Sequence, residues 1–186
     1  RAVAEGAGLA TRPPLDLRVN ALKSNRDRLA KALKRHGAVP THLSPLGLRI
    51  TAPEGPGRLP NVEIEAAHAK GWFEVQDEGS QIAALLAGAK PGEQVVDYCA
   101  GAGGKTLALA AAMENRGQIH AHDSDRARLR PLYDRLKRSG ARNVQVVPGD
   151  EGALDHLEGK ADLVLVDAPC SGTGVWRRRP DAKWRL

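Results

Sequence analysis

Two glycine-rich segments hold the side chains of this chain that are best suited to chemistry. The first, Asp97–Thr106, reads Asp-Tyr-Cys-Ala-Gly-Ala-Gly-Gly-Lys-Thr, and the second, Asp167–Gly174, reads Asp-Ala-Pro-Cys-Ser-Gly-Thr-Gly. Each follows a short apolar run. Glycine lets a backbone approach a ligand closely, and the start of a helix offers unpaired N–H groups to oxygen atoms. The two segments therefore indicate a small-molecule site that combines carboxylate, ammonium and thiol groups.

The spacing of the first segment distinguishes three ligands. An ATP-binding G-x-x-x-x-G-K-[ST] loop needs glycine five residues before Gly104, where the sequence has Cys99. A dinucleotide-binding G-x-G-x-x-G that starts at Gly101 needs glycine at position 106, where threonine stands. Asp123 ends the next apolar run and is suited to ribose hydroxyls. S-adenosylmethionine fits best, because carboxylates repel a pyrophosphate but tolerate a sulfonium cation. The carboxylates that end apolar runs are Asp97, Asp123, Asp150 and Asp167.

From about Leu15 onwards the chain resembles the Sun-type (Fmu/RsmB-like) RNA cytosine 5-methyltransferases. The matching stretches, in the order of the family, are Leu17–Asn20, Phe73–Gln81, the first glycine-rich segment, the second one and Pro180–Trp184. Relatives often have proline at Ala102, a departure that leaves the glycines and the lysine intact. The resemblance implies S-adenosylmethionine as the cofactor. It also implies that the following residues contact this donor: Cys99, Ala100, Gly101, Ala102, Gly103, Gly104, Lys105, Asp123, Asp150 and Asp167.

The resemblance further implies catalytic roles for three residues. The 5-carbon of cytosine is a weak nucleophile, so a cysteine thiolate first adds to the neighbouring 6-carbon. In the family, the aspartate at the position of Asp167 hydrogen-bonds the ring nitrogen as charge develops there. Chemistry alone favours Cys170 as the nucleophile, whereas the resemblance implies that this cysteine assists product release. Lys105 is expected to contact the donor or to hold carboxylates such as Asp167.

The attacking cysteine of the family lies in a later Thr-Cys-Ser-like segment. This sequence ends at Leu186 without such a segment, and its cysteines are Cys99 and Cys170. We therefore expect no turnover from these 186 residues alone. The favoured substrate is small-subunit ribosomal RNA. Transfer RNA and large-subunit RNA remain alternatives, as does a catalytically inactive RNA-binding module that retains the donor fold.

The charge of the chain favours RNA as its partner. The net charge is +6 and the sequence pI is about 9.6, which suits a polyanion through phosphate contacts and counterion release. The alternative is a merely solvated basic surface. A cluster of three arginines follows Trp176, next to the expected cytosine pocket. The residues predicted to contact RNA are Arg18, Lys23, Arg177, Arg178, Arg179 and Lys183.

Composition indicates the cellular setting. The chain has two cysteines, no apolar run of bilayer length and no signal-like start, which favours a soluble protein in the reducing cytoplasm. The six histidines lack ligand-like spacing with the cysteines, so no metal site is expected. Neither a membrane nor an obligate protein partner is predicted.

These functional residues need an alternating α/β scaffold. Apolar runs at residues 94–97, 118–122, 144–147 and 163–166 alternate with helical segments, which is typical of a doubly wound, mainly parallel sheet. One helix is expected to begin at Ser124 and to end at Gly140. Residues 73–186 are thus predicted to form a Rossmann-like class I methyltransferase core, incomplete at its C-terminal side. The run before Asp167 is expected at an exposed sheet edge.

Residues 1–72 are predicted to form a small basic α+β lobe. Strands are expected at 16–20 and 46–50, separated by a helix from residue 25 to about 36. Ser24 is the expected N-cap of this helix and Gly37 its stop. A proline- and glycine-rich stretch at 53–57 then breaks the chain. This strand–helix–strand order resembles the RNA-binding lobe that precedes the catalytic domain of the family.

Overall fold

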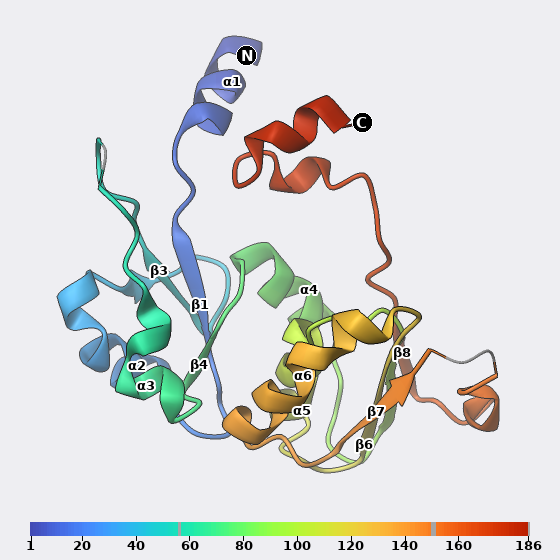
Figure 1. Cartoon of the computed structure of the whole chain (residues 1–186). Coiled ribbons are helices and arrows are strands. Elements are labelled where there is room, and N and C mark those ends of the chain that lie inside the picture. The colour runs from blue at the N-terminus through green and yellow to red at the C-terminus, as the bar shows by residue number, and fades with distance from the viewer. Residues whose placement is uncertain (56, 150–151, 186) are drawn as a thin grey trace.

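The computed structural model describes residues 1–55, 57–149 and 152–185, and its strands form two four-stranded sheets (Figure 1). The strands are β1 (Leu15–Val19), β2 (Val39–Pro40), β3 (Gly47–Ile50), β4 (Phe73–Val75), β5 (Gln94–Asp97), β6 (Gln118–Asp123), β7 (Val144–Pro148) and β8 (Leu163–Leu165). The α-helices are α1 (Ala2–Ala10), α2 (Arg26–Ala32), α3 (Ala66–Ala69), α4 (Glu78–Ala87), α5 (Gly104–Ala112) and α6 (Arg126–Ser139). Short 3₁₀ turns cover Lys34–His36, Val62–Ile64, Asp155–Leu157, Thr173–Val175 and Pro180–Arg185.

The first sheet is antiparallel and has the order β2-β3-β1-β4. Its core forms because Leu17 and Val19 of β1 meet Leu29 of α2 and Phe73 of β4, all four with no exposed surface. Burial of large apolar side chains of this kind stabilises a fold by about 1.5–3 kcal/mol each. The helix and the two strands predicted for residues 16–50 are therefore confirmed, with β2 as an additional edge strand.

The second sheet is parallel and has the order β7-β6-β5-β8, so its first two strands in the chain lie at the centre. This is the order of a doubly wound Rossmann-like sheet, as predicted. Successive side chains of β6 point to opposite faces of the sheet. Ile119 and Ala121 pack in the cores with α5 and α6, whereas the rings of His120 and His122 meet His156 and Tyr98. β8 forms one edge of the sheet, where the run before Asp167 was expected.

Two predicted helix caps are displaced by one residue. The N-cap of α2 is Asn25, whose side chain accepts the Arg28 N–H, and not Ser24. The N-cap of α6 is Asp125, which accepts the Ala127 N–H at 2.8 Å. Ser124 was therefore the wrong cap, because the next residue carries a carboxylate that reaches the first turn. The stops at Gly37 and Gly140 are confirmed by their left-handed backbone, with φ of 66° and 76°.

The two sheets divide the chain at a point slightly after residue 72. β4 follows this predicted boundary but pairs with β1 in the first sheet, in the register Leu17 with Val75 and Val19 with Phe73. The polypeptide then enters α4 and the second sheet. A division into two domains at 72/73 stays a prediction.

Two further features complete the fold. α1 buries none of its side chains, and Figure 1 shows it projecting from β1 near the C-terminal turns. Among the helices of the described part of the chain, none has the length and apolar character required to cross a membrane.

Candidate functional site

A glycine-rich loop between β5 and α5 forms the floor of the candidate site. Gly101 and Gly103 have positive φ values of 52° and 82°, which side chains rarely tolerate. A Cβ at Gly103 would lie 2.2 Å from Cδ1 of Leu132, which has no exposed surface. Glycine is thus required at this position by both backbone conformation and space. The loop is anchored to β6, because the Ala100 N–H donates to the His122 carbonyl at 2.8 Å.

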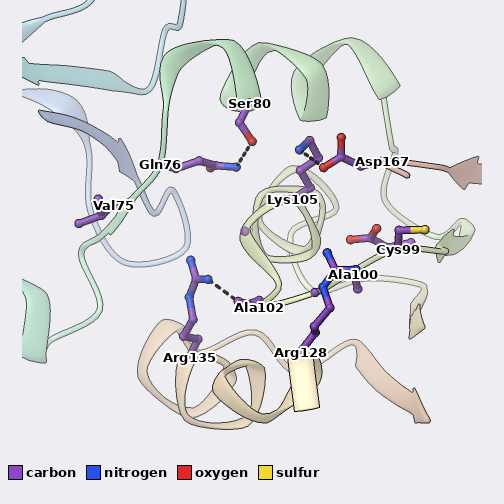
Figure 2. Close-up of a pocket in the computed structure, with 13 residues that line it drawn as sticks. Val75, Gln76, Ser80, Cys99, Ala100, Ala102, Lys105, Arg128, Arg135 and Asp167 are labelled. Carbon is purple, nitrogen blue, oxygen red and sulfur yellow. Dashed lines mark hydrogen bonds and ion pairs between the residues drawn. The ribbon is translucent and has the colours of Figure 1, made fainter. Parts of the chain in front are cut away.

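A cleft of about 260 Å³ lies above this loop (Figure 2). Of the residues predicted to bind the donor, it is lined by Cys99, Ala100, Gly101, Ala102, Gly104, Lys105 and Asp167. The structure therefore brings most of the predicted set together around one opening. A second hollow of about 340 Å³ begins at the adjoining residues Tyr98, His122 and Ser124. Asp150, also predicted to contact the donor, lies outside the described residues.

Asp97 is the buried carboxylate of the cleft. It is 1% exposed, and its Oδ2 accepts a hydrogen bond from the Thr106 hydroxyl at 2.7 Å. Its Oδ1 is buried and has no hydrogen-bond partner among the described residues. Burial raises the pKa of Asp97 to about 6, although the Thr106 bond and the nearby Lys105 ammonium oppose this shift. An acceptor oxygen without a partner is costly inside a protein and suits a cationic ligand group.

Asp123, at the end of β6, is 1% exposed and helps to hold the loop. Its Oδ2 accepts the Gly101 N–H at 3.0 Å, and its Oδ1 accepts the Asp125 N–H at 3.0 Å. The Arg128 guanidinium lies 3.3 Å from Oδ2. A carboxylate has about four lone-pair sites, so these contacts leave acceptor capacity for ribose hydroxyls.

The two loops meet through an ion pair. Lys105, which is 14% exposed, places its Nζ 2.5 Å from Oδ2 of Asp167, which is 56% exposed, and Figure 2 shows both side chains pointing toward the cleft. The expectation that Lys105 holds Asp167 agrees with this contact. The pair keeps an acidic and a basic group together in the lining of the cleft.

The two cysteines differ in their surroundings. Cys99 is half-buried beside the loop, and burial raises the pKa of its thiol, so at neutral pH it is a poor nucleophile. Cys170 is exposed, and the Gly172 N–H donates to its Sγ at 3.4 Å. Cys170 is not among the residues that line the cleft.

The structure contradicts the prediction that Arg18 contacts RNA. Arg18 is 2% exposed and donates to Gln76 and to the Gly104 carbonyl. Its guanidinium is therefore buried and hydrogen-bonded inside the protein, where RNA does not reach it. Lys23 is exposed, but its Nζ donates to the Arg138 carbonyl at 2.7 Å at the end of α6. It therefore acts as a cap of that helix end.

The three arginines after Trp176 differ in whether their guanidinium groups already have partners within the protein. Arg177 donates to Thr11 and to the Arg12 carbonyl, and Arg178 pairs with Asp77. Arg179 is exposed, and the structure records no side-chain bond for it within the described residues. The side chain of Lys183 lies outside what the structure describes. The predicted RNA contact of Arg179 is thus the one whose geometry leaves the guanidinium available.

Sequence reasoning missed five residues that line the cleft: Val75, Gln76, Ser80, Arg128 and Arg135. Gln76 and Ser80 lie inside one of the stretches that carry the family resemblance, which was a usable signal. Arg128 and Arg135 are seven residues apart on α6 and so share one face of the helix. That spacing also occurs on solvent-exposed helices and gives no signal by itself.

The sheet order, the glycine-rich first crossover and the acidic strand ends define the core of a Rossmann-like methyltransferase. A solved methyltransferase homologue from Pyrococcus horikoshii superposes with a TM-score of 0.77 at 30% identity, over 99% of this chain and 60% of that one. The model of the family 16S rRNA methyltransferase RsmB/F matches residues 83–186. The chain belongs to this family.

Curated relatives agree with the assignment. The ribosomal RNA small subunit methyltransferase B of Citrobacter koseri is 39% identical over 176 residues, which are 93% of this chain and 40% of the relative. The probable enzyme of the same name from Synechocystis is 36% identical over 178 residues, or 93% and 39%. The chain thus spans about two fifths of the length of these relatives.

Proposed function

We propose that this chain is the donor-binding part of an S-adenosylmethionine-dependent methyltransferase that forms 5-methylcytosine in RNA, with small-subunit ribosomal RNA as its substrate. The observation that carries the donor assignment is the unpartnered Oδ1 of Asp97. The cations that line the cleft each have a carboxylate partner: Lys105 has Asp167, Arg128 has Asp123, and Arg135 has Glu74. Of the two carboxylates that line the cleft, Asp167 is paired with Lys105, whereas Asp97 has no ion pair and its Oδ1 accepts no hydrogen bond from the described residues.

The residues present fit this donor. The Asp97 carboxylate suits the ammonium of the methionine part, and Asp123 suits the ribose hydroxyls. Gly101 and Gly103 carry no side chains, so a ligand can approach the backbone of the loop closely at these two positions. When bound, S-adenosylmethionine supplies an electrophilic methyl group on a sulfonium. The protein's part is to hold that group beside the ion pair of Lys105 and Asp167.

The RNA part of the proposal rests on the family and on charge. Curated relatives carry names of small-subunit ribosomal RNA methyltransferases, and the chain has a net charge of +6. Asp167 is the residue proposed to hydrogen-bond the cytosine ring, because it is exposed at the mouth of the cleft and kept in place by Lys105. We also propose that residues 1–72 belong to an RNA-binding lobe. A ribosomal RNA substrate favours a cytoplasmic location for the reaction.

Donor binding is tested by titrating the chain with S-adenosylhomocysteine in a calorimeter, with ATP and NAD as competing candidates. We expect saturable binding of S-adenosylhomocysteine alone. Asp97→Asn is expected to weaken it by about tenfold or more, because a charge-assisted hydrogen bond contributes about 1.5–3 kcal/mol. Asp134→Asn, a matched change at an exposed position of α6, is expected to leave binding unchanged. Folded wild-type protein that binds ATP or NAD instead would overturn the donor assignment.

The substrate is tested separately by filter binding of RNA. We expect a small-subunit ribosomal RNA fragment to bind more tightly than transfer RNA or a large-subunit fragment at 150 mM salt, with affinity that falls as salt rises. Equal affinity for all three RNAs would remove the support for a small-subunit substrate but leave the donor assignment intact.

A further inference from the structure

The donor loop is held at two carbonyl groups by arginines. Nη1 of Arg135 donates to the Ala102 carbonyl at 2.7 Å, as Figure 2 shows, and Nη2 of Arg18 donates to the Gly104 carbonyl at 3.3 Å. These carbonyls lie on either side of Gly103, the N-cap of α5, whose φ is 82°. Hydrogen bonds on both sides of a left-handed residue restrict the conformations that the loop can adopt.

Arg18 comes from the first sheet, not from the sheet that carries the loop. It lies on β1 and its Nε donates to Oε1 of Gln76 at 2.5 Å. Gln76 in turn donates to the Ser80 hydroxyl at 3.1 Å, and both of these residues line the cleft. Burial lowers the pKa of Arg18 to about 10, and the nearby Glu74 carboxylate opposes that shift. Arg18 therefore stays charged at neutral pH and spans from the first sheet to the loop.

Arg135 is on α6, but its charge partner is also in the first sheet. Glu74 of β4 is 3% exposed and accepts from Nε of Arg135 at 2.9 Å. The same carboxylate accepts from Nη2 of Arg138 at 2.8 Å. Glu74 thus fixes the direction of the Arg135 guanidinium, whose other edge reaches the Ala102 carbonyl. Arg138 shares the carboxylate, and the structure records no bond from its side chain to the described loop residues.

We propose that Glu74, Arg135 and Arg18 form a loop clamp, a set of positioning residues through which the first sheet sets the shape of the donor loop. Glu74 and Arg18 lie before residue 83, where the match to the family model begins. By this proposal, donor affinity depends in part on two strands of the first sheet, β1 with Arg18 and β4 with Glu74. The inference rests on the proposed function for the identity of the donor. The effect of the clamp on the shape of the loop does not depend on that identity.

Two variants of the same ion-pair network separate positioning from simple stabilisation. Arg135→Met removes a guanidinium that bonds both Glu74 and the Ala102 carbonyl of the loop. Arg138→Met removes a guanidinium that bonds Glu74 but no described residue of the loop. In the free protein, we expect Arg135→Met and Glu74→Gln to shift the amide resonances of Gly103 and Gly104 in NMR spectra. Arg138→Met and the exposed control Arg130→Met are expected to leave these resonances in place.

Binding of S-adenosylhomocysteine is measured on the same proteins by calorimetry. We expect Arg135→Met and Glu74→Gln each to weaken binding by about tenfold, and the double variant by little more than either one, since both break one unit. Arg138→Met is expected to stay within twofold of wild type, whatever its effect on the melting temperature. Arg18→Met serves as an additional variant where it folds.

The outcomes are distinct. Unshifted glycine amides in Arg135→Met, or equal loss of binding in Arg135→Met and Arg138→Met, would overturn the loop clamp. Wild-type protein that fails to bind S-adenosylhomocysteine would overturn the proposed donor, while the NMR comparison would still decide the effect of the clamp on the loop.

Discussion

The pH dependence of donor binding gives a quantitative test of the role of Asp97. With a pKa of about 6, this carboxyl is about 9% ionised at pH 5 and about 91% ionised at pH 7. If the ammonium of S-adenosylhomocysteine binds the ionised form, the apparent Kd scales with the inverse of that fraction. We therefore expect Kd to be about tenfold higher at pH 5 than at pH 7, and to change little above pH 7.

The same shift predicts how Asp97 affects stability. The folded-state pKa lies above the ordinary value of 3.8, so between about pH 4 and pH 6 the native protein retains a proton that the unfolded chain has lost. Stability consequently falls as pH rises through this window. The full loss, about 3 kcal/mol from 2.2 pH units at 1.36 kcal/mol each, is present above pH 6.

Asp97→Asn is the perturbation that exposes both effects. We expect it to flatten the pH profile of Kd between pH 5 and 7, and to raise the free energy of unfolding by up to about 3 kcal/mol at pH 7.5 but not at pH 4. Calorimetric titration supplies Kd, and urea denaturation supplies the stability. A wild-type Kd that stays constant from pH 5 to 7 in folded protein would refute the assignment of Asp97 to the donor ammonium.

Three other expectations follow from named contacts. Gly103→Ala should destabilise the protein by about 2–4 kcal/mol in urea denaturation and abolish donor binding, because it combines a left-handed backbone with a clash against Leu132, whereas Gly174→Ala, with open space around it, should change little. Iodoacetamide at pH 7 should alkylate Cys170 faster than Cys99 by mass spectrometry, and S-adenosylhomocysteine should protect Cys99 alone; equal rates would contradict the difference in burial. Arg179→Glu should weaken RNA binding and reduce the slope of log affinity against log salt concentration by about one. An unchanged slope would count against this contact.

The scaffold was largely predictable because its signals are local. Short apolar runs that alternate with helical segments predicted the four parallel strands, and glycines predicted the helix ends at positions 37 and 140. The helix starts were wrong by one residue, because serine and the next residue both carry capping oxygens and the sequence does not show which one reaches the first turn. Membership of β4 in the first sheet was not predictable, since pairing with β1 depends on a contact between distant segments.

The site was predictable where chemistry requires a residue type inside a short loop. The glycines, Lys105 and Asp167 belong to this class, and the cleft contains most of them. Arg18 was mispredicted because a basic residue beside other basic residues resembles a surface for phosphates, while its partners Gln76 and Gly104 are far away in sequence. Arg135 was missed for the same reason, because its contacts with the site run through Glu74 and the Ala102 carbonyl, which are also distant in sequence.

The buried carboxylate links donor binding to folding. At neutral pH, we expect ionised Asp97 to lower the stability of the free protein by up to about 3 kcal/mol, since among the described residues no group bonds its Oδ1. A ligand that binds the folded state alone stabilises it by about 2.7 kcal/mol at a concentration of 100 times Kd. A saturating donor therefore offsets roughly what the free carboxylate costs. The donor site is thus also a weak point of the free fold, and the loop clamp holds the loop next to this carboxylate in shape before any donor arrives.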